Sequence, residues 1–147
     1  MITDKRRAFK ADRPVMHRIA RELAKRKERM VVLNGAGSFG HIPVRRYALH
    51  EGFSPHRNTS FSETKLRLLR LQEILLTVLR SHGIAVVPFS PSSFMTARSG
   101  RLWRVELTPV QQFLSLGLIP LLGGDLLPDL DRGWTVVSAD QMASWIA

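Results

Sequence analysis

The sequence predicts an α/β fold with a mainly parallel sheet, and three observations lead to this prediction. Short apolar runs with β-branched residues have the length and composition of buried strands. Helical segments lie between these runs, and strands that alternate with helices are typical of parallel sheets. The chain has 147 residues and no stretch that could serve as a linker, so we expect one domain over residues 1–147.

The first elements follow from proline positions and apolar patterns. A helix is predicted over residues 12–29, where Pro14 suits the first helical turn. Residues 30–34 are short, apolar and partly β-branched, which predicts a buried strand. A second helix is expected over about 38–49. Because proline is well tolerated only in the first turn of a helix, we expect Pro43 to lie there.

The longest predicted helix follows a loop over residues 51–60, which is rich in Gly, Ser, Pro, Asn and Thr. Ser60 and Glu63 resemble a capping box, leucines supply the buried side, and Gly83 ends the helix after about Ser81. The remaining expected elements are a strand at 84–88, a turn or short helical piece at 90–94, a hairpin arm at 101–107, a helix from 108 to about 117, strands at 118–122 and 134–138, and a helix over 139–147.

The composition is globular and strongly basic, with 22 Lys+Arg against 12 Asp+Glu and a net charge of +10. This charge favours anionic partners, but it does not choose among nucleotides, phosphate esters, nucleic acid and acidic lipid. The absence of cysteine excludes disulfides and thiolate chemistry and suits a reducing compartment. No apolar run approaches the ~20 residues of a membrane span, and no secretory signal precedes the fold, so we expect a cytoplasmic protein without a membrane partner.

A glycine-rich turn, Gly35-Ala-Gly-Ser-Phe-Gly-His41, lies between the first strand and the second helix. Glycines let the backbone approach a ligand closely, and the free N–H groups of a helix N-terminus bind anions. An ordinary tight turn is the plainer alternative. The string also fits the dinucleotide fingerprint, but the next strand comes only at Ile84 and Glu63 falls inside a helix, which disfavours a nicotinamide or flavin site. A P-loop is excluded because no Gly-Lys-Ser/Thr follows.

The glycine turn is one of a series of segments, which in chain order are Ile2-Thr-Asp-Lys5, Asn34-Gly-Ala-Gly-Ser-Phe-Gly-His41, Ala85-Val-Val-Pro-Phe-Ser-Pro-Ser-Ser-Phe94, Gly117-Leu-Ile-Pro-Leu-Leu-Gly-Gly-Asp125 and Gly133-Trp-Thr-Val-Val-Ser-Ala-Asp140. Together they resemble the isopentenyl phosphate kinases of the amino-acid kinase superfamily. The likeness covers nearly the whole chain in the right order, which makes it more specific than any single motif.

The resemblance implies a three-layer αβα sandwich that transfers the γ-phosphoryl group of ATP, with Mg²⁺, to isopentenyl phosphate. The acceptor is already an anion, so positioning and charge stabilisation matter more than a strong base. His41 and Lys5 are the implied catalytic residues, because imidazole can donate to phosphate and a lysine can reach the transferred group. The implied substrate contacts are Gly35, Gly40, His41, Ala139 and Asp140, and the implied contacts of the ATP phosphates are Lys5, Ala36 and Gly37. No metal-ligating residue is implied.

The chain departs from the family pattern at both ends and at two glycine positions. A first strand with Gly-Gly-Ser before Ile2, and a carboxy-terminal nucleotide-binding half, are expected to be missing, so that this truncated chain holds the acceptor-binding half. Ala36 and Ala139 stand where the family has glycine, and an added Cβ could crowd the phosphates. We therefore expect a homodimer or a completing chain as partner, and weak turnover or none from this chain alone.

Two alternatives stay open from the sequence. A kinase of another small phosphate or phosphonate acceptor would carry the same motifs. A non-catalytic module could bind anions or nucleic acid through the basic first helix, although that helix lacks the interleaved aromatic residues that stack on bases. The other histidines have no spacing typical of a metal site, and we expect surface or capping roles for them: His17, His50, His56 and His82.

Overall fold

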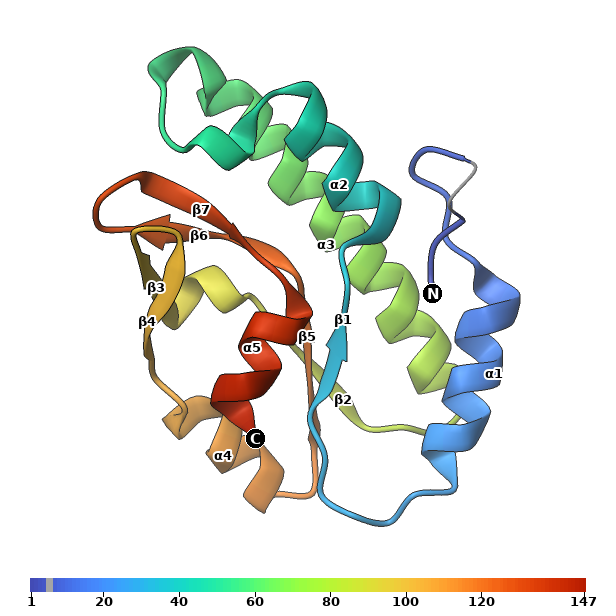
Figure 1. Ribbon diagram of the computed structural model, residues 1–147. Helices are drawn as coiled ribbons and strands as arrows, with labels where there is room; N and C mark the ends of the chain where they lie inside the picture. The colour runs from blue at the N-terminus through green and yellow to red at the C-terminus, as the bar shows by residue number, and fades with distance from the viewer. Residues whose placement is uncertain (5–6) are drawn as a thin grey trace.

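The computed structural model describes residues 1–4 and 7–147. Its elements form three layers (Figure 1), with a central sheet between α1 and α3 on one face and α4 and α5 on the other. The helices are α1 (Arg13–Ala24), α2 (Gly37–Arg46), α3 (Asn58–Ser81), α4 (Thr108–Ser115) and α5 (Ala139–Ile146), with short 3₁₀ turns η1 (Leu49–Glu51), η2 (Pro55–Arg57) and η3 (Pro91–Ser93). The strands are β1 (Val32–Asn34), β2 (Val86–Phe89), β3 (Met95–Arg98), β4 (Arg101–Val105), β5 (Ile119–Gly123), β6 (Asp125–Asp129) and β7 (Gly133–Val137).

The central sheet has the spatial order β1-β5-β2, and both of its strand pairs are parallel. A second sheet has the order β4-β3-β6-β7, with antiparallel β3–β4 and β6–β7 pairs and a parallel β3–β6 pair. Only Gly124 separates β5 from β6, so the second sheet continues from the carboxyl end of the first. The predicted α/β sandwich with a parallel sheet is confirmed, and the hairpin expected at 101–107 forms with β3 as its other arm.

The core lies on both faces of β5, the middle strand of the central sheet. Neighbouring residues of a strand point to opposite faces, and Leu121 and Leu122 do so here. Leu121 packs in a cluster with Leu79 of α3 and Met16 of α1. Leu122 belongs to a second cluster with Met142 of α5. These two clusters hold the helices on the sheet and thereby fix the loops at its carboxyl edge, where ligands bind in α/β folds.

Asp129, at the end of β6, joins two turns. Its carboxylate accepts hydrogen bonds from the backbone N–H groups of Ser99 at 3.1 Å, Gly100 at 2.7 Å, Asp131 at 2.9 Å and Arg132 at 3.0 Å. Burial by itself raises the pKa of Asp129, but the four N–H donors outweigh that effect and hold the pKa below its ordinary value. The β3–β4 turn and the β6–β7 turn are therefore fastened to one charged group.

Two helix boundaries and one proline differ from the sequence predictions. The first helix ends at Ala24 rather than at 29, because the five residues that follow include four cations whose repulsion disfavours a continued helix. Pro43 lies in the second turn of α2, where its ring is buried, and the helix ends soon afterwards at Arg46. The long helix begins at Asn58, and the expected capping box is wrong.

The residues of that expected capping box lie inside α3. The carbonyl of Ser60 accepts from the Thr64 hydroxyl at 2.7 Å, and the Glu63 carboxylate accepts from the Arg67 guanidinium at 2.5 Å. The sequence also does not predict β6, since Pro128 and its terminal aspartates are poor strand formers. Within the described residues, no helix is both long enough and apolar enough to cross a membrane.

Candidate functional site

The glycine turn, residues 34–41, runs from the last residue of β1 into the first residues of α2. Ala36 has right-handed helical dihedrals, with φ −66° and ψ −23°, and Gly37 has a positive φ of 50°. A right-handed residue followed by a left-handed one directs successive backbone N–H groups toward one point, an arrangement that binds anions. The turn therefore has the backbone geometry of an anion site at a helix N-terminus.

Thr3 and Gly124 hold the turn from two sides. The N–H of Ser38 donates to Thr3 Oγ1 at 3.2 Å, and the N–H of Gly124 donates to the carbonyl of Asn34 at 2.9 Å. A Cβ added to Gly37 would lie 2.1 Å from Thr3 Oγ1. Gly37 is thus required both for its positive φ and for the space that Thr3 occupies.

A cavity of about 340 Å³, which we call the α5-side cavity, lies between the glycine turn, α2, α3 and the start of α5. The N-termini of α2 and α5 both border it, and each helix dipole favours an anion there. Its apolar lining is Leu33, Val44, Leu68, Leu126, Val136 and Val137. Its lining includes these residues from the predicted site: Gly35, Ala36, Gly40, His41, Ala139 and Asp140.

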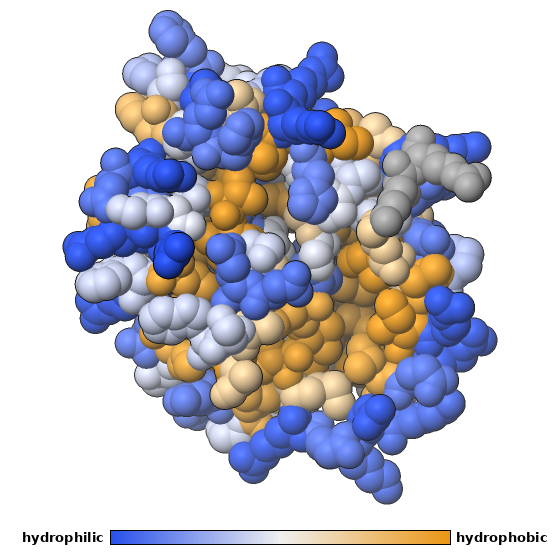
Figure 2. Space-filling view, viewed as in Figure 1, coloured by the Kyte–Doolittle hydropathy of each residue, from blue (hydrophilic) through white to orange (hydrophobic). Residues whose placement is uncertain are grey.

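A second cavity of about 630 Å³, the α1-side cavity, lies between β1, α1 and α3 and is lined mainly by apolar side chains. Figure 2 shows apolar surface gathered in the middle of this face, with hydrophilic residues around it. Gly37 lines the α1-side cavity but not the α5-side cavity, whereas Gly35 and His41 line both cavities. The exposed imidazole of His41 thus stands where the two spaces meet.

The two alanines of the site sit at helix starts. A Cβ added to Gly40 would lie 2.4 Å from the Cβ of Ala36, so the bare backbone of Gly40 makes room for the Ala36 methyl group. Ala139 is the first residue of α5, after the N-cap Ser138, whose hydroxyl accepts from the N–H of Gln141 at 3.3 Å. That the alanine methyl groups crowd a phosphate stays a prediction.

Two buried polar atoms of the turn have no partner among the described residues, Asn34 Oδ1 and Ser38 Oγ. Both residues line the α1-side cavity. Since buried polar atoms are nearly always hydrogen-bonded in native proteins, these two mark the turn as a place where a ligand or water completes the bonding.

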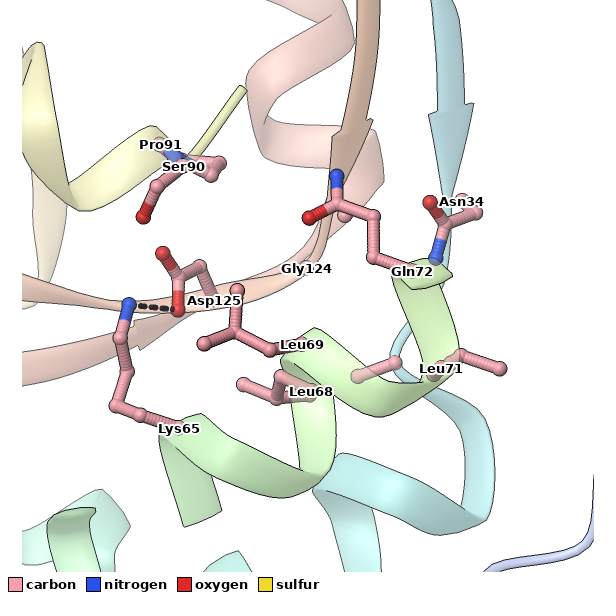
Figure 3. A pocket seen from close by; sticks show the side chains of 12 residues that line it. Asn34, Lys65, Leu68, Leu69, Leu71, Gln72, Ser90, Pro91, Gly124 and Asp125 are labelled. Carbon is pink, nitrogen blue, oxygen red and sulfur yellow. Dashed lines mark hydrogen bonds and ion pairs between the residues drawn. The ribbon is translucent and has the colours of Figure 1, made fainter. Parts of the chain in front are cut away.

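Sequence reasoning placed the turn and its histidine but missed the residues that support them. Thr3 gave no signal beyond its place in the Ile2-Thr-Asp-Lys5 segment. Lys65 of α3 pairs with the buried Asp125 at the start of β6, with 2.5 Å between Nζ and Oδ1 (Figure 3), and nothing in the sequence links the two. Lys5, predicted to be catalytic, lies outside the described residues.

The parallel sheet, with a glycine turn at a helix N-terminus that borders two cavities and an imidazole beside it, defines an α/β protein with a candidate anion site. Comparison with known proteins shows to which family within this class the chain belongs. The chain belongs to the amino acid kinase family, whose sequence pattern it matches over residues 1–147.

The relatives in this family include several isopentenyl phosphate kinases. The enzyme of Methanothermobacter thermautotrophicus is 30% identical over 139 residues, which cover 89% of this chain and 52% of that protein. The enzyme of Arabidopsis thaliana is 30% identical over 122 residues, covering 81% of this chain and 37% of that protein. The chain therefore spans about half the length, or less, of these curated relatives.

Solved structures agree with this assignment. An X-ray structure of isopentenyl phosphate kinase is 28% identical and superimposes with a TM-score of 0.85, covering 90% of this chain and 57% of that one. The crystal structure of an isopentenyl phosphate kinase substrate complex has a TM-score of 0.87 at 21% identity, covering 99% of this chain and 60% of the other, which supports the fold.

Proposed function

We propose that this chain binds isopentenyl phosphate in the α5-side cavity and holds its phosphate as the acceptor of the γ-phosphoryl group of ATP. One observation carries the proposal. The cavity brings the N-terminal end of α2, with Gly35 and His41, against the N-terminal end of α5, with Ala139 and Asp140. These segments are about 100 residues apart in the sequence, and both were expected to contact the acceptor.

The cavity lining suits a small phosphate ester with a short hydrocarbon tail. Backbone N–H groups of the turn, other than that of Ser38, which donates to Thr3 Oγ1, and the dipoles of two helices would hold the phosphate. The His41 imidazole would donate a further hydrogen bond to a phosphate oxygen. The side chains of Val44, Leu68 and Val136 would enclose the tail, because burying its CH₂ groups removes apolar surface from water.

His41 lines both cavities, and this position suits the proposed reaction. In the proposed reaction, a phosphate oxygen of the acceptor forms a bond to the γ-phosphorus of ATP, the bond from that phosphorus to the β–γ bridging oxygen breaks, and ADP leaves. Gly37, which lines the α1-side cavity, and Ala36, which lines the α5-side cavity, would contact the nucleotide phosphates, while His41 steadies the acceptor. The proposed catalytic role of Lys5 completes this charge stabilisation.

Mg²⁺ would accompany the nucleotide and neutralise charge on its phosphates. In phosphoryl-transfer sites this ion is bound by the phosphates, water and one or two carboxylates. Asp140, whose exposed carboxylate lines the α5-side cavity, would be the protein ligand of this ion, since no group of three or more candidate metal ligands lies among the described residues.

A completing chain is the partner that we propose, because β1 is an edge strand beside a large apolar cavity. The order β1-β5-β2 leaves the outer side of β1 without a strand among the described residues. Exposed edges and apolar surface favour association with another polypeptide segment. A cytoplasmic location stays a prediction.

Binding tests the proposal directly, and we would titrate the isotope-labelled chain with isopentenyl phosphate by heteronuclear NMR. We expect shifts in the amides of residues 35–41 and 138–140, and at least a tenfold weaker affinity for the His41→Ala variant. Isopentenol, which lacks the phosphate, should bind far more weakly. Shifts confined to other regions would contradict the acceptor site.

A panel of ligands separates the alternative functions. Tighter binding of another phosphate or phosphonate at the same amides would keep the site and change the acceptor. Binding of an oligonucleotide with a steep salt dependence, with shifts along α1 and none in the glycine turn, would instead favour the nucleic-acid module.

A further inference from the structure

A partly buried ion pair lies beside the glycine turn. The Lys65 ammonium contacts Asp125 Oδ1 at 2.5 Å and donates to Ser92 Oγ at 2.8 Å. The other carboxylate oxygen of Asp125 accepts from the N–H of Ser92 at 3.2 Å, and Oδ1 also accepts from the N–H of Leu126 at 2.8 Å. Asp125 is only 6% exposed. Figure 3 shows Lys65 reaching across from α3 to this carboxylate.

Asp125 lines the α5-side cavity as well as the small space that contains Lys65. An unpaired carboxylate at this buried position would repel a phosphate in the same cavity, because a charge shielded from water interacts strongly with its neighbours. Lys65 approaches it from the side of α3, and its own side chain is 23% exposed. The wall of a cavity proposed to bind an anion thus holds a negative charge with a cation against it.

We propose that Lys65 is a positioning residue for the acceptor phosphate, which acts by neutralising Asp125 and by fixing the backbone beside it. The inference rests on the proposed binding of a phosphate ester in the α5-side cavity. Lys65 itself lines the neighbouring space and not this cavity. Its effect therefore passes through Asp125 rather than through contact with the ligand.

The backbone contribution follows from the position of Gly124. This residue precedes Asp125, donates its N–H to the carbonyl of Asn34 at 2.9 Å, and would have a Cβ only 3.3 Å from the nitrogen of Ala36. The ion pair anchors the start of β6, and Gly124 transmits that position to the glycine turn. Loss of the cation would therefore affect both the charge of the cavity wall and the support of the turn.

A double-mutant cycle, measured with a charged and an uncharged ligand, separates the electrostatic contribution from the backbone contribution. We would measure affinities for isopentenyl phosphate and for uncharged isopentenol with the full chain, its Lys65→Met variant, its Asp125→Asn variant and the double variant. Lys65→Met should weaken isopentenyl phosphate binding about tenfold and isopentenol binding less than twofold. Asp125→Asn, which keeps the shape and frees a cation, should strengthen phosphate binding about threefold, and the double variant should return to within threefold of the parent.

Lys65→Arg keeps the charge and should bind isopentenyl phosphate nearly as well as the parent. Lys25→Met is the matched control, since Lys25 pairs with Glu22 at the exposed C-terminal end of α1 and its loss should leave both affinities unchanged. Circular dichroism checks that each variant is folded, and Asp125→Asn decides the question if Lys65→Met is not. Equal losses for both ligands, or weaker phosphate binding by Asp125→Asn, would overturn the proposal. A parent chain that binds no phosphate ester would instead refute the proposed function.

Discussion

The substitution of Gly37 by alanine tests the geometry of the glycine turn more sharply than any other change. The φ of 50° at Gly37 is costly for alanine, by about 1–2 kcal/mol. The new Cβ would also lie 2.1 Å from Oγ1 and 2.7 Å from Cγ2 of Thr3, a side chain that is only 3% exposed. Thr3 must then move, which removes its hydrogen bond from the N–H of Ser38 and crowds its surroundings.

The lost hydrogen bond costs about 1 kcal/mol and the crowding about 1–3 kcal/mol, so we expect Gly37→Ala to lower the free energy of unfolding by about 4 kcal/mol. For a chain of this length, each kcal/mol corresponds to about 3 °C in Tm. Thermal unfolding followed by circular dichroism should therefore show a decrease of about 12 °C.

Gly35→Ala is the matched control, because a Cβ at Gly35 meets nothing within 4 Å and its φ is not positive. Its free energy of unfolding should stay within about 0.5 kcal/mol of the parent. Its affinity for isopentenyl phosphate should fall, since the methyl group enters the lining of both cavities. A Gly37→Ala variant that melts at the parent temperature would refute the described turn.

Three further changes probe the support of the site. Asp129→Asn should cost about 2 kcal/mol at neutral pH, measured by urea unfolding, because a charged acceptor of four N–H groups becomes neutral. The lowered pKa of Asp129 means that its contribution is complete above about pH 4–5 and is lost as the pH falls through the folded-state pKa, so parent and variant should converge in acid. Leu121→Ala removes a fully buried side chain from the middle strand and should cost about 2–5 kcal/mol in the same assay, with a loss near zero arguing against the described core. Ser138→Ala deletes the N-cap of α5 and should lower Tm by about 3 °C, while an unchanged Tm would contradict the capping box.

The alternation of strands and helices was predictable because apolar runs and glycine stops act locally. β6 was not, since its pairing with β7 brings Leu126 opposite Val136 and Pro128 opposite Trp134, and such partners are invisible in the sequence of one segment. The prediction that Pro43 lies in the first turn of its helix was also wrong. Burial of its ring against the rest of the fold outweighs the loss of the helical hydrogen bond that proline cannot make.

The candidate site, like the fold, was predictable only in part. The spacing of glycines and the adjacent His41 predicted an anion-binding turn, because backbone freedom and helix polarity follow from residue type. The support by Thr3, and the pairing of Lys65 with Asp125 across 60 residues, depend on tertiary contacts. Nothing in the sequence around Lys65, on a helix rich in leucine and arginine, indicates that it pairs with a buried carboxylate. Only the folded chain shows this pairing.

The common boundary formed by Gly35 and His41 has a thermodynamic consequence. If each cavity binds a ligand, both ligands contact Gly35 and His41, so we expect the two binding free energies to be coupled, and such a coupling is reciprocal. A compound that tightens its neighbour's binding must be tightened by it to the same degree. The coupling free energy can be measured by saturating one cavity and then titrating the other. The measurement in the reverse order should give the same value.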